Sequence, residues 1–274
     1  MRVRRPHPAR GERPVAAVAA LFGLFLGLPV VALVARALLD GSLGRAISSR
    51  VVLDALGLSL VTTAISLVIT VALGLPLAFV LARRSFRGKG WIEAIVDLPI
   101  VLPPSVAGLA LLLVFGRRGL LSQPLEGLGL SVPFTTIAVI LAQTFVSAPF
   151  FIRSARTGIA SVDPDLEDAA RVDGASEGQL FRAITVPLAS AALAAGLVMT
   201  WARSLGEFGA TIMFAGNVEG RTQTLPLVVY AEFQGGDLDA SVAAAAILVL
   251  AALGVLIAVR VFGWGRLLES RSVT

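Results

Sequence analysis

The chain has 274 residues, of which 56% are hydrophobic and only 15% are charged, and its mean hydropathy is +0.86. This composition excludes an ordinary soluble domain and is typical of a membrane protein. The formal net charge of +5 does not indicate nucleic-acid binding, because the basic residues are spread over several flanks of apolar segments.

Six apolar segments are each as long as the roughly 17 to 25 residues that a membrane helix needs. We therefore expect an all-α integral membrane protein with a single transmembrane domain over residues 15–265, flanked by tails at 1–14 and 266–274. An Arg-rich start precedes the first apolar run, as in a signal peptide, but the run is too long for one, so we expect an uncleaved helix. The predicted spans cover residues 15–38, 55–82, 95–116, 133–153, 187–208 and 240–262.

The distribution of lysine and arginine predicts the orientation of these spans. Basic residues concentrate in segments that share one side of the membrane if both termini are cytoplasmic, as the positive-inside rule requires. These segments are the two tails, the loop after the second span and the loop after the fourth span. The smaller set on the other side comprises Arg36, Arg45, Arg50, Arg117, Arg118 and Arg221.

Three prolines, Pro99, Pro103 and Pro104, interrupt the third predicted span. Proline removes backbone donors and must break or bend the helix. Such a break is tolerated at membrane depth where the freed groups face protein or a water-filled cavity. Ser105, directly after the break, could offer a hydroxyl or a backbone N–H to an anion. A packing kink explains the prolines equally well, so a role of Pro103, Pro104 and Ser105 in a translocation pathway is one of two interpretations.

A polar segment at residues 160–187 separates the fourth and fifth predicted spans. Asp163 is a typical N-cap for a short helix, and Gly174 can take the left-handed conformation that ends it. Ser176 and Gln179 have the spacing of a capping box that opens a second short helix. The segment therefore predicts a helical hairpin with defined ends.

This hairpin would form a rigid lever, because its second helix leads into the fifth span at Pro187. Small side chains at Ala169 and Ala170 would let another surface approach. Such a shape suits the docking of a partner by helix-in-groove contact. The alternative interpretation is an ordinary amphipathic loop that lies on the membrane surface.

Arg203 and Glu207 lie four residues apart near the end of the fifth span and so share a helix face. Pairing between them would lower the cost of placing two charges at membrane depth. The pair is either a gate near the outer surface or an interfacial ion pair at the helix end. Gly206 and Gly209 flank Glu207 and would permit close helix approach or local unwinding. The stretch GNVEGRTQTLP that follows, residues 216–226, predicts an exposed loop.

The polar segment also resembles the EAA signature of permease subunits of bacterial ABC importers. That signature is Glu-Ala-Ala, three residues, Gly, nine residues, Ile, one residue and Leu-Pro; here Asp168 replaces the Glu and Val186 the Leu. In that family the segment docks into a cleft of a separate ATPase. The resemblance implies a six-transmembrane-helix permease fold with a cytoplasmic coupling hairpin between helices 4 and 5. The implied coupling residues are Glu167, Asp168, Ala169, Ala170, Gly174, Phe181, Ile184 and Pro187.

Two longer stretches, residues 97–121 and 202–230, resemble the molybdate-transport permeases in particular. Tungstate and sulfate remain alternatives, because all three are tetrahedral dianions of similar shape. The resemblance implies a permease homodimer in the lipid of a bacterial inner membrane, a cytoplasmic ATPase dimer that binds ATP and magnesium, and a periplasmic or lipid-anchored molybdate-binding protein. It implies no cofactor in this chain.

Other functional classes lack the residues that they need. The only histidine is His7 and the pattern GxxxxGK[ST] is absent, so we expect no histidine-based active site, no metal site and no ATP hydrolysis by this chain. An ion-coupled secondary anion transporter is a rival, but we find no internal repeat and no carboxylate in the middle of a span. A structural scaffold would not explain the capped hairpin.

Overall fold

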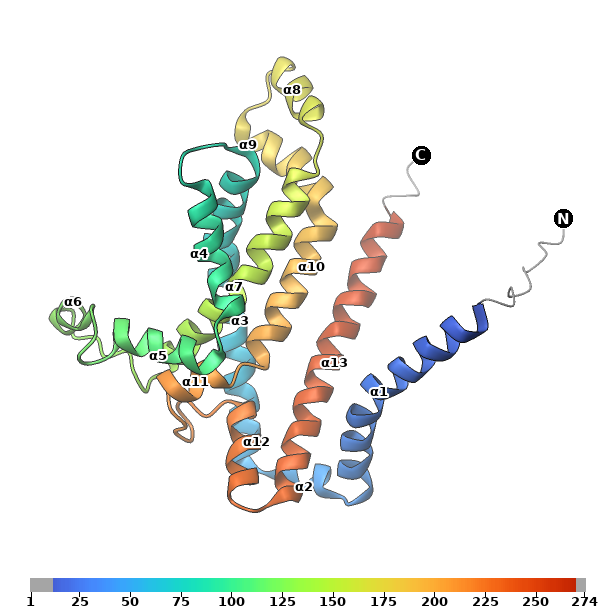
Figure 1. Cartoon of the computed structure of the whole chain (residues 1–274), viewed down its shortest axis with the longest axis vertical. Helices are drawn as coiled ribbons and strands as arrows, with labels where there is room; N and C mark the ends of the chain where they lie inside the picture. Colours follow the sequence, from blue (N-terminus) through green and yellow to red (C-terminus); the bar gives the residue numbers. More distant parts are fainter. Residues whose placement is uncertain (1–11, 270–274) are drawn as a thin grey trace.

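The structure of the chain is a computed structural model that describes residues 12–269, with side-chain surroundings for residues 14–257. The described residues form helices and no strand (Figure 1). Most of the predicted tail 1–14 and the end of the predicted tail 266–274 lie outside them. The fold is therefore all-α over the described part of the chain, as predicted.

Among the residues that the structure describes, five helices are long and apolar enough to cross a membrane, and a sixth span results if a bent helix pair is counted as one. This agrees with the six predicted spans. The bent pair consists of α4 (Lys89–Val101) and α5 (Pro104–Phe115). The five long helices are α1 (Glu12–Leu39), α3 (Arg50–Arg83), α7 (Thr136–Ala160), α10 (Val186–Leu205) and α13 (Leu238–Glu269).

The break expected at the prolines of the third predicted span, residues 95–116, is present between α4 and α5. The axes of α4 and α5 differ by 119°, and α4 begins six residues earlier, at Lys89. Two consecutive prolines cause the break, because the residue before a proline is driven out of the helical conformation. Leu102 and Pro103 are accordingly extended, with ψ of 132° and 134°.

Two further boundaries of predicted spans need correction. The fourth helix, α7, covers residues 136–160 instead of 133–153. The fifth, α10, ends at Leu205 instead of residue 208, so Glu207 follows the helix instead of lying within it. Gly206 is the C-cap residue of α10, with φ of −86° and ψ of 9°.

Four short helices were not predicted, because their apolar stretches are too short for a span. The predicted exposed loop at 216–226 is also only partly correct: residues 217–221 are exposed, but Thr222, Thr224 and Leu225 are buried. The reason is a short helix that follows directly and packs on the long helices. The four short helices are α2 (Ser42–Ser48), α6 (Ser122–Gly127), α11 (Gly209–Phe214) and α12 (Leu225–Gln234).

The centre of the molecule is formed by α3, α7 and α10, which pack against one another. On α3 the small and hydroxyl side chains point inward, whereas large apolar side chains such as Val61, Val68 and Leu73 are exposed. A helix in lipid gains nothing by hiding leucine, and small residues let helix backbones approach closely. The buried stripe on α3 comprises Ser59, Thr62, Thr63, Ser66, Thr70, Gly74 and Ala78.

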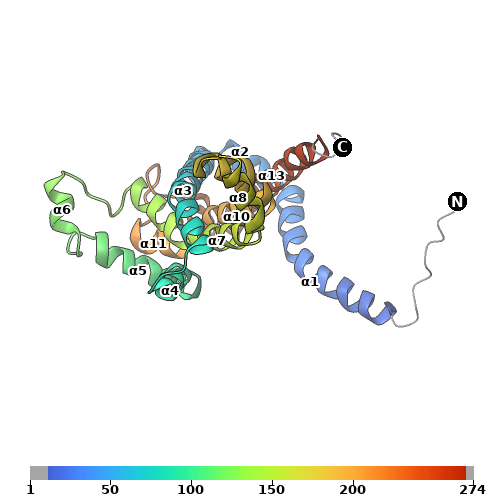
Figure 2. The same cartoon turned by 90° about the horizontal axis from the view of Figure 1, so that it is seen from above.

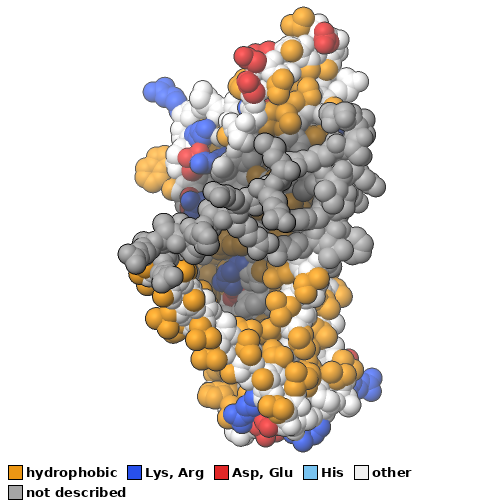
Figure 3. All heavy atoms as spheres, turned by 90° about the vertical axis from the view of Figure 1, so that its right-hand side faces the viewer, with side chains coloured by type: hydrophobic (Ala, Val, Ile, Leu, Met, Phe, Trp, Pro, Cys, Tyr) orange, Lys and Arg blue, Asp and Glu red, His pale blue; other side chains and the backbone are white. Residues whose placement is uncertain are grey.

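The peripheral helices are arranged around this centre. Helix α1 contacts α2 and α13 and diverges from the other helices toward its amino end (Figures 1 and 2). The face shown in Figure 3 is largely hydrophobic over its lower half, and charged side chains return at its lower end. An apolar surface bounded by charge is the pattern of a protein surrounded by lipid.

Candidate coupling and translocation sites

The polar hairpin is built as the sequence predicts, from α8 (Pro164–Val172), α9 (Glu177–Leu180) and a π-helical turn, η1 (Phe181–Thr185). The side chain of Asp163 accepts a hydrogen bond from the Asp165 amide, and Ser176 and Gln179 form both bonds of a capping box. The hairpin lies at the end of the molecule toward which α13 runs (Figure 1). The predicted helix ends are thus confirmed.

Gly174 makes the turn between the two short helices with φ of +88°, as predicted. Arg171 closes the turn from the side: its Nε donates to Glu177 Oε1 at 2.8 Å, and its Nη1 donates to Asp168 Oδ1 at 2.7 Å. The hydrogen bond from Arg171 lowers the pKa of the Glu177 carboxyl, and the bonds to Glu177 and Asp168 raise the pKa of Arg171. The two short helices are therefore tied by charge as well as by the turn.

The eight predicted coupling residues divide into two groups. The first group is exposed or partly exposed and comprises Asp168, Ala169, Ala170, Gly174 and Pro187. The apolar side chain of Val172, which was not among the predicted residues, lies beside them and is 88% exposed. Glu167, Phe181 and Ile184 instead face the chain itself. Phe181 meets Phe79 edge to face, with ring centroids 5.3 Å apart, and Ile184 packs against the cluster formed by α3, α7 and α10. Of the eight predicted coupling residues, the first group is therefore more exposed than the second.

The second arm of the hairpin is continuous with α10, since residues 177–205 form one helical stretch. The π-helical turn stands directly before Pro187. Proline cannot donate the backbone bond that an uninterrupted α-helix requires, and an insertion of this kind is one way for a helix to pass a missing donor. No loop therefore separates α9 from the transmembrane helix α10.

The buried carboxylate of Glu167 has partners that sequence reasoning missed. Arg83, at the end of α3, donates from Nη2 to Glu167 Oε1 at 2.5 Å, and Thr185 Oγ1 donates to the same oxygen at 2.8 Å. In the sequence, Arg83 stands among other basic residues of a loop predicted to be cytoplasmic. No local signal distinguishes it from Arg84 or Arg87.

The translocation candidates come together where two helices are broken. The break between α4 and α5 lies against the break between α10 and α11. A Cβ atom added to Gly209 would lie 2.7 Å from Pro104 Cβ and 3.2 Å from the Ser105 nitrogen. Gly209 therefore lies beside Pro104 and Ser105, and the chain is exposed at Pro103, Pro104 and Ser105.

Arg203 and Glu207 pair as predicted, with Nη1 2.5 Å from Oε2. The contact lacks the alignment of a hydrogen bond, and the other oxygen, Oε1, accepts the Ala210 amide at 2.7 Å. The Glu207 side chain is 1% exposed and that of Arg203 is 28% exposed. Glu207 thus accepts a hydrogen bond from the first turn of α11 and pairs with a partly exposed arginine.

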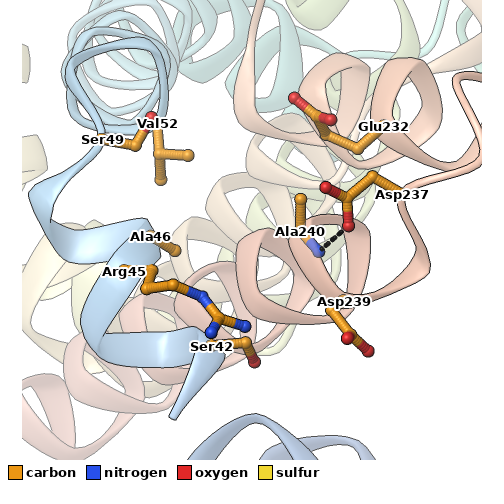
Figure 4. A pocket seen from close by; sticks show the side chains of 9 residues that line it. All are labelled: Ser42, Arg45, Ala46, Ser49, Val52, Glu232, Asp237, Asp239 and Ala240. Carbon is orange, nitrogen blue, oxygen red and sulfur yellow. Dashed lines mark hydrogen bonds between the residues drawn. The ribbon is translucent and has the colours of Figure 1, made fainter. Parts of the chain in front are cut away.

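A cleft of about 260 Å³ lies at the opposite end of the molecule, between α2 and the turn from α12 to α13 (Figure 4). Three carboxylates, those of Glu232, Asp237 and Asp239, line it together with Arg45. Asp237 already accepts the Ala240 amide, and Asp239 pairs with Arg36. A dianion would be repelled by this lining, so the cleft is not an oxyanion site.

A model of the family described as "Binding-protein-dependent transport system inner membrane component" matches residues 74–272 of the chain. The chain belongs to this family. The match includes the hairpin and both broken helices. It starts within α3 and leaves α1 and α2 outside.

Two permeases of known name are similar to most of the chain. The "Molybdenum transport system permease protein ModB" of Mycobacterium bovis is 45% identical over 205 residues, which cover 75% of this chain and 77% of that protein. The "Molybdate/tungstate transport system permease protein WtpB" of Pyrococcus abyssi is 36% identical over 246 residues, covering 89% and 92%.

A crystal structure of a bacterial ABC transporter involved in the import of the polysaccharide alginate has the same fold. Its TM-score to this chain is 0.73, and the match covers 97% of each chain at 19% sequence identity. At that identity the likeness concerns the fold alone. The predicted fold, that of an ABC importer permease, is thereby confirmed.

Proposed function

We propose that this chain is the permease subunit of an ATP-driven importer that moves molybdate into the cytoplasm. The proposal is supported by family membership, by two molybdate-related permeases that match most of the chain, and by the hairpin. The hairpin is the observation that carries the mechanism, because an exposed, capped lever continuous with a transmembrane helix is what an external motor needs.

A cytoplasmic ATPase dimer is the proposed motor, and ATP and magnesium bind there and not to this chain. Its contact surface is the exposed group of Asp168, Ala169, Gly174 and Val172, where small and apolar side chains stand beside acidic ones. This mixture suits a groove with apolar walls and a basic rim. The hairpin and both termini then lie in the cytoplasm, in agreement with the distribution of basic residues.

A binding protein outside the cytoplasm is the proposed source of the substrate, in line with the family description. It would dock at the end opposite the hairpin, where α2 and α12 lie (Figure 1). Two copies of the chain form the transmembrane unit, because two ATPase subunits require two hairpins and a two-fold homodimer supplies them. The assembly resides in a bacterial inner membrane.

The substrate pathway passes the paired helix breaks. Pro103 lies in the break, and Pro104 and Ser105 begin α5; all three are exposed. Arg203 provides a partly exposed cation whose charge Glu207 offsets. An anion meets a weak and reversible attraction at such a place. A pathway must release its cargo, so weak attraction serves it better than a tight site.

Competitive uptake into vesicles tests the proposal. Purified permease, ATPase and binding protein are reconstituted, and ATP-dependent uptake is measured with molybdate, tungstate and sulfate in competition. Molybdate or tungstate should stimulate ATP hydrolysis more than sulfate at equal concentration. A preference for sulfate would assign the chain to sulfate import. Uptake that needs an ion gradient and no ATPase would replace the importer by a secondary transporter.

A further inference from the structure

Of the acidic residues of α8, only Glu167 is buried. It is 4% exposed as a residue, whereas its neighbours Asp165 and Asp168 are exposed. A buried carboxylate is costly unless it is paired and hydrogen-bonded. Glu167 meets that requirement through Arg83 and Thr185, which belong to two other elements.

Besides Glu167, Arg83 also binds the backbone at the start of the hairpin. Its Nη1 and Nη2 each donate to the carbonyl oxygen of Val162 at 3.3 Å, and Val162 lies between the end of α7 and the start of α8. The side chain of Arg83 is only 16% exposed. One guanidinium therefore grips both the connecting backbone and the first turns of α8, a geometry for which arginine is better suited than lysine.

These contacts connect the hairpin to a helix with which it has no covalent link. By sequence, the hairpin joins only α7 and α10, yet Arg83 is the last residue of α3. Near its other end, α3 carries the buried Ser59, whose Oγ accepts the Leu225 amide at the start of α12 at 2.8 Å. The spacing from Arg83 to Ser59 is about 36 Å along a helix at roughly 1.5 Å per residue.

We infer that Arg83 is a positioning residue that couples the hairpin to α3, so that movement imposed on the hairpin is carried along α3 to α12 at the opposite end. This inference rests on the proposed function, since it requires a motor at the hairpin. It adds a route for the motion beside α10. In this role Arg83 acts on the hairpin through Glu167 and Val162.

The coupling ratio, the number of ATP molecules hydrolysed per molybdate ion imported, tests the inference in reconstituted vesicles. Arg83→Met should leave the ATPase bound in a pull-down and ATP hydrolysis active, while the coupling ratio rises several-fold. Arg83→Lys keeps a cation that can reach one acceptor and should recover part of the coupling. Arg87→Met, at an exposed arginine of the following loop, is the matched control and should behave as wild type. An unchanged coupling ratio in Arg83→Met would overturn the inference.

A distance measurement decides the matter even if Arg83→Met does not assemble. The chain has no cysteine, so spin labels can be placed selectively at Ser85→Cys and Asp173→Cys, two exposed positions after α3 and after α8. In the otherwise wild-type complex, the distance between the labels should stay the same with and without bound ATP, because the end of α3 and the hairpin move together. A change in that distance refutes the coupling of hairpin and α3. Failure of the wild-type chain to retain any ATPase would instead refute the proposed function.

Discussion

Gly209 approaches Ser105 so closely that a single added carbon would lie 3.2 Å from the Ser105 nitrogen. The contact joins the break that follows α4 to the break that follows α10. Both breaks free backbone groups from regular helix hydrogen bonding, and such groups are tolerated at membrane depth only where protein or water satisfies them. This is why the proposed substrate pathway is placed at the two breaks.

A methyl group at Gly209 should therefore impair transport. Gly209→Ala would place its Cβ 2.7 Å from Pro104 Cβ, so the two breaks must separate, at a cost of about 1 to 3 kcal/mol for overpacking. We expect molybdate uptake to fall several-fold. Gly206→Ala is the control on the other side of Glu207, because its added carbon would meet only the Ala202 carbonyl oxygen, at an ordinary 3.5 Å. Equal uptake by both variants would contradict the close approach.

The two members of the Arg203–Glu207 pair should respond differently to removal of charge. Arg203→Met leaves the buried carboxylate of Glu207 without a compensating cation, which costs about 3 to 5 kcal/mol. Glu207→Gln retains an acceptor for the Ala210 amide and leaves a partly exposed arginine that can reach water, so its effect should be smaller. Thermal unfolding in detergent and uptake in vesicles would measure both. The exposed pair of Arg50 and Asp54, with the same spacing, supplies the control Asp54→Asn, which should be silent.

The sequence was sufficient to predict what local chemistry determines. The cap at Asp163, the left-handed turn at Gly174 and the capping box at Ser176 each depend on residues within four positions, and all three are present. The six apolar segments likewise follow from span length alone. The charge pair of Arg203 and Glu207 was predicted because an i, i+4 spacing brings the two side chains together whenever the backbone stays near helical.

Contacts between distant elements could not be predicted in this way. The ion pair of Arg83 and Glu167 joins residues that are 84 positions apart. Other arginines stand near Arg83 in the sequence, and other acidic residues stand near Glu167, so the sequence does not show which of them pair. The meeting of Gly209 with Pro104 depends on a 119° bend between α4 and α5. Prolines indicate that a helix breaks there, but the direction of the bend is set by packing against α7 and α11.

Close packing between α7 and α10 should be as sensitive to added volume as the helix breaks. A Cβ atom at Gly158 would lie 2.4 Å from Ala192 Cβ, so Gly158→Ala forces the helices apart and should destabilise the protein by about 1 to 3 kcal/mol. Gly57→Ala on α3, where nothing lies within 4 Å, should be neutral or slightly stabilising, because alanine favours a helix. Thermal unfolding of the two variants side by side would show the difference. Matching midpoints would contradict the close packing at Gly158.

The turn of the hairpin offers the sharpest test of its role. Gly174 and Gly178 lie four residues apart in the same hairpin, and an added Cβ atom would meet nothing within 4 Å at either position. They differ in backbone conformation, since Gly174 has φ of +88° and Gly178 lies in α9. Gly174→Ala must strain the turn by about 1 to 2 kcal/mol, because a side chain disfavours the left-handed region. Gly178→Ala adds the same atoms without that strain.

Relief of the strain should change the angle between α8 and α9 while the transmembrane helices stay in place, because the turn lies outside their packing. We expect Gly174→Ala to insert at nearly normal abundance, to bind its ATPase more weakly and to hydrolyse more ATP per molybdate ion imported. Gly178→Ala should match wild type in all three measurements. A pull-down of the ATPase and a vesicle uptake assay provide the values. If Gly174→Ala binds and transports as well as Gly178→Ala, the angle of the hairpin does not matter to the motor, and the hairpin is a surface loop instead of a lever.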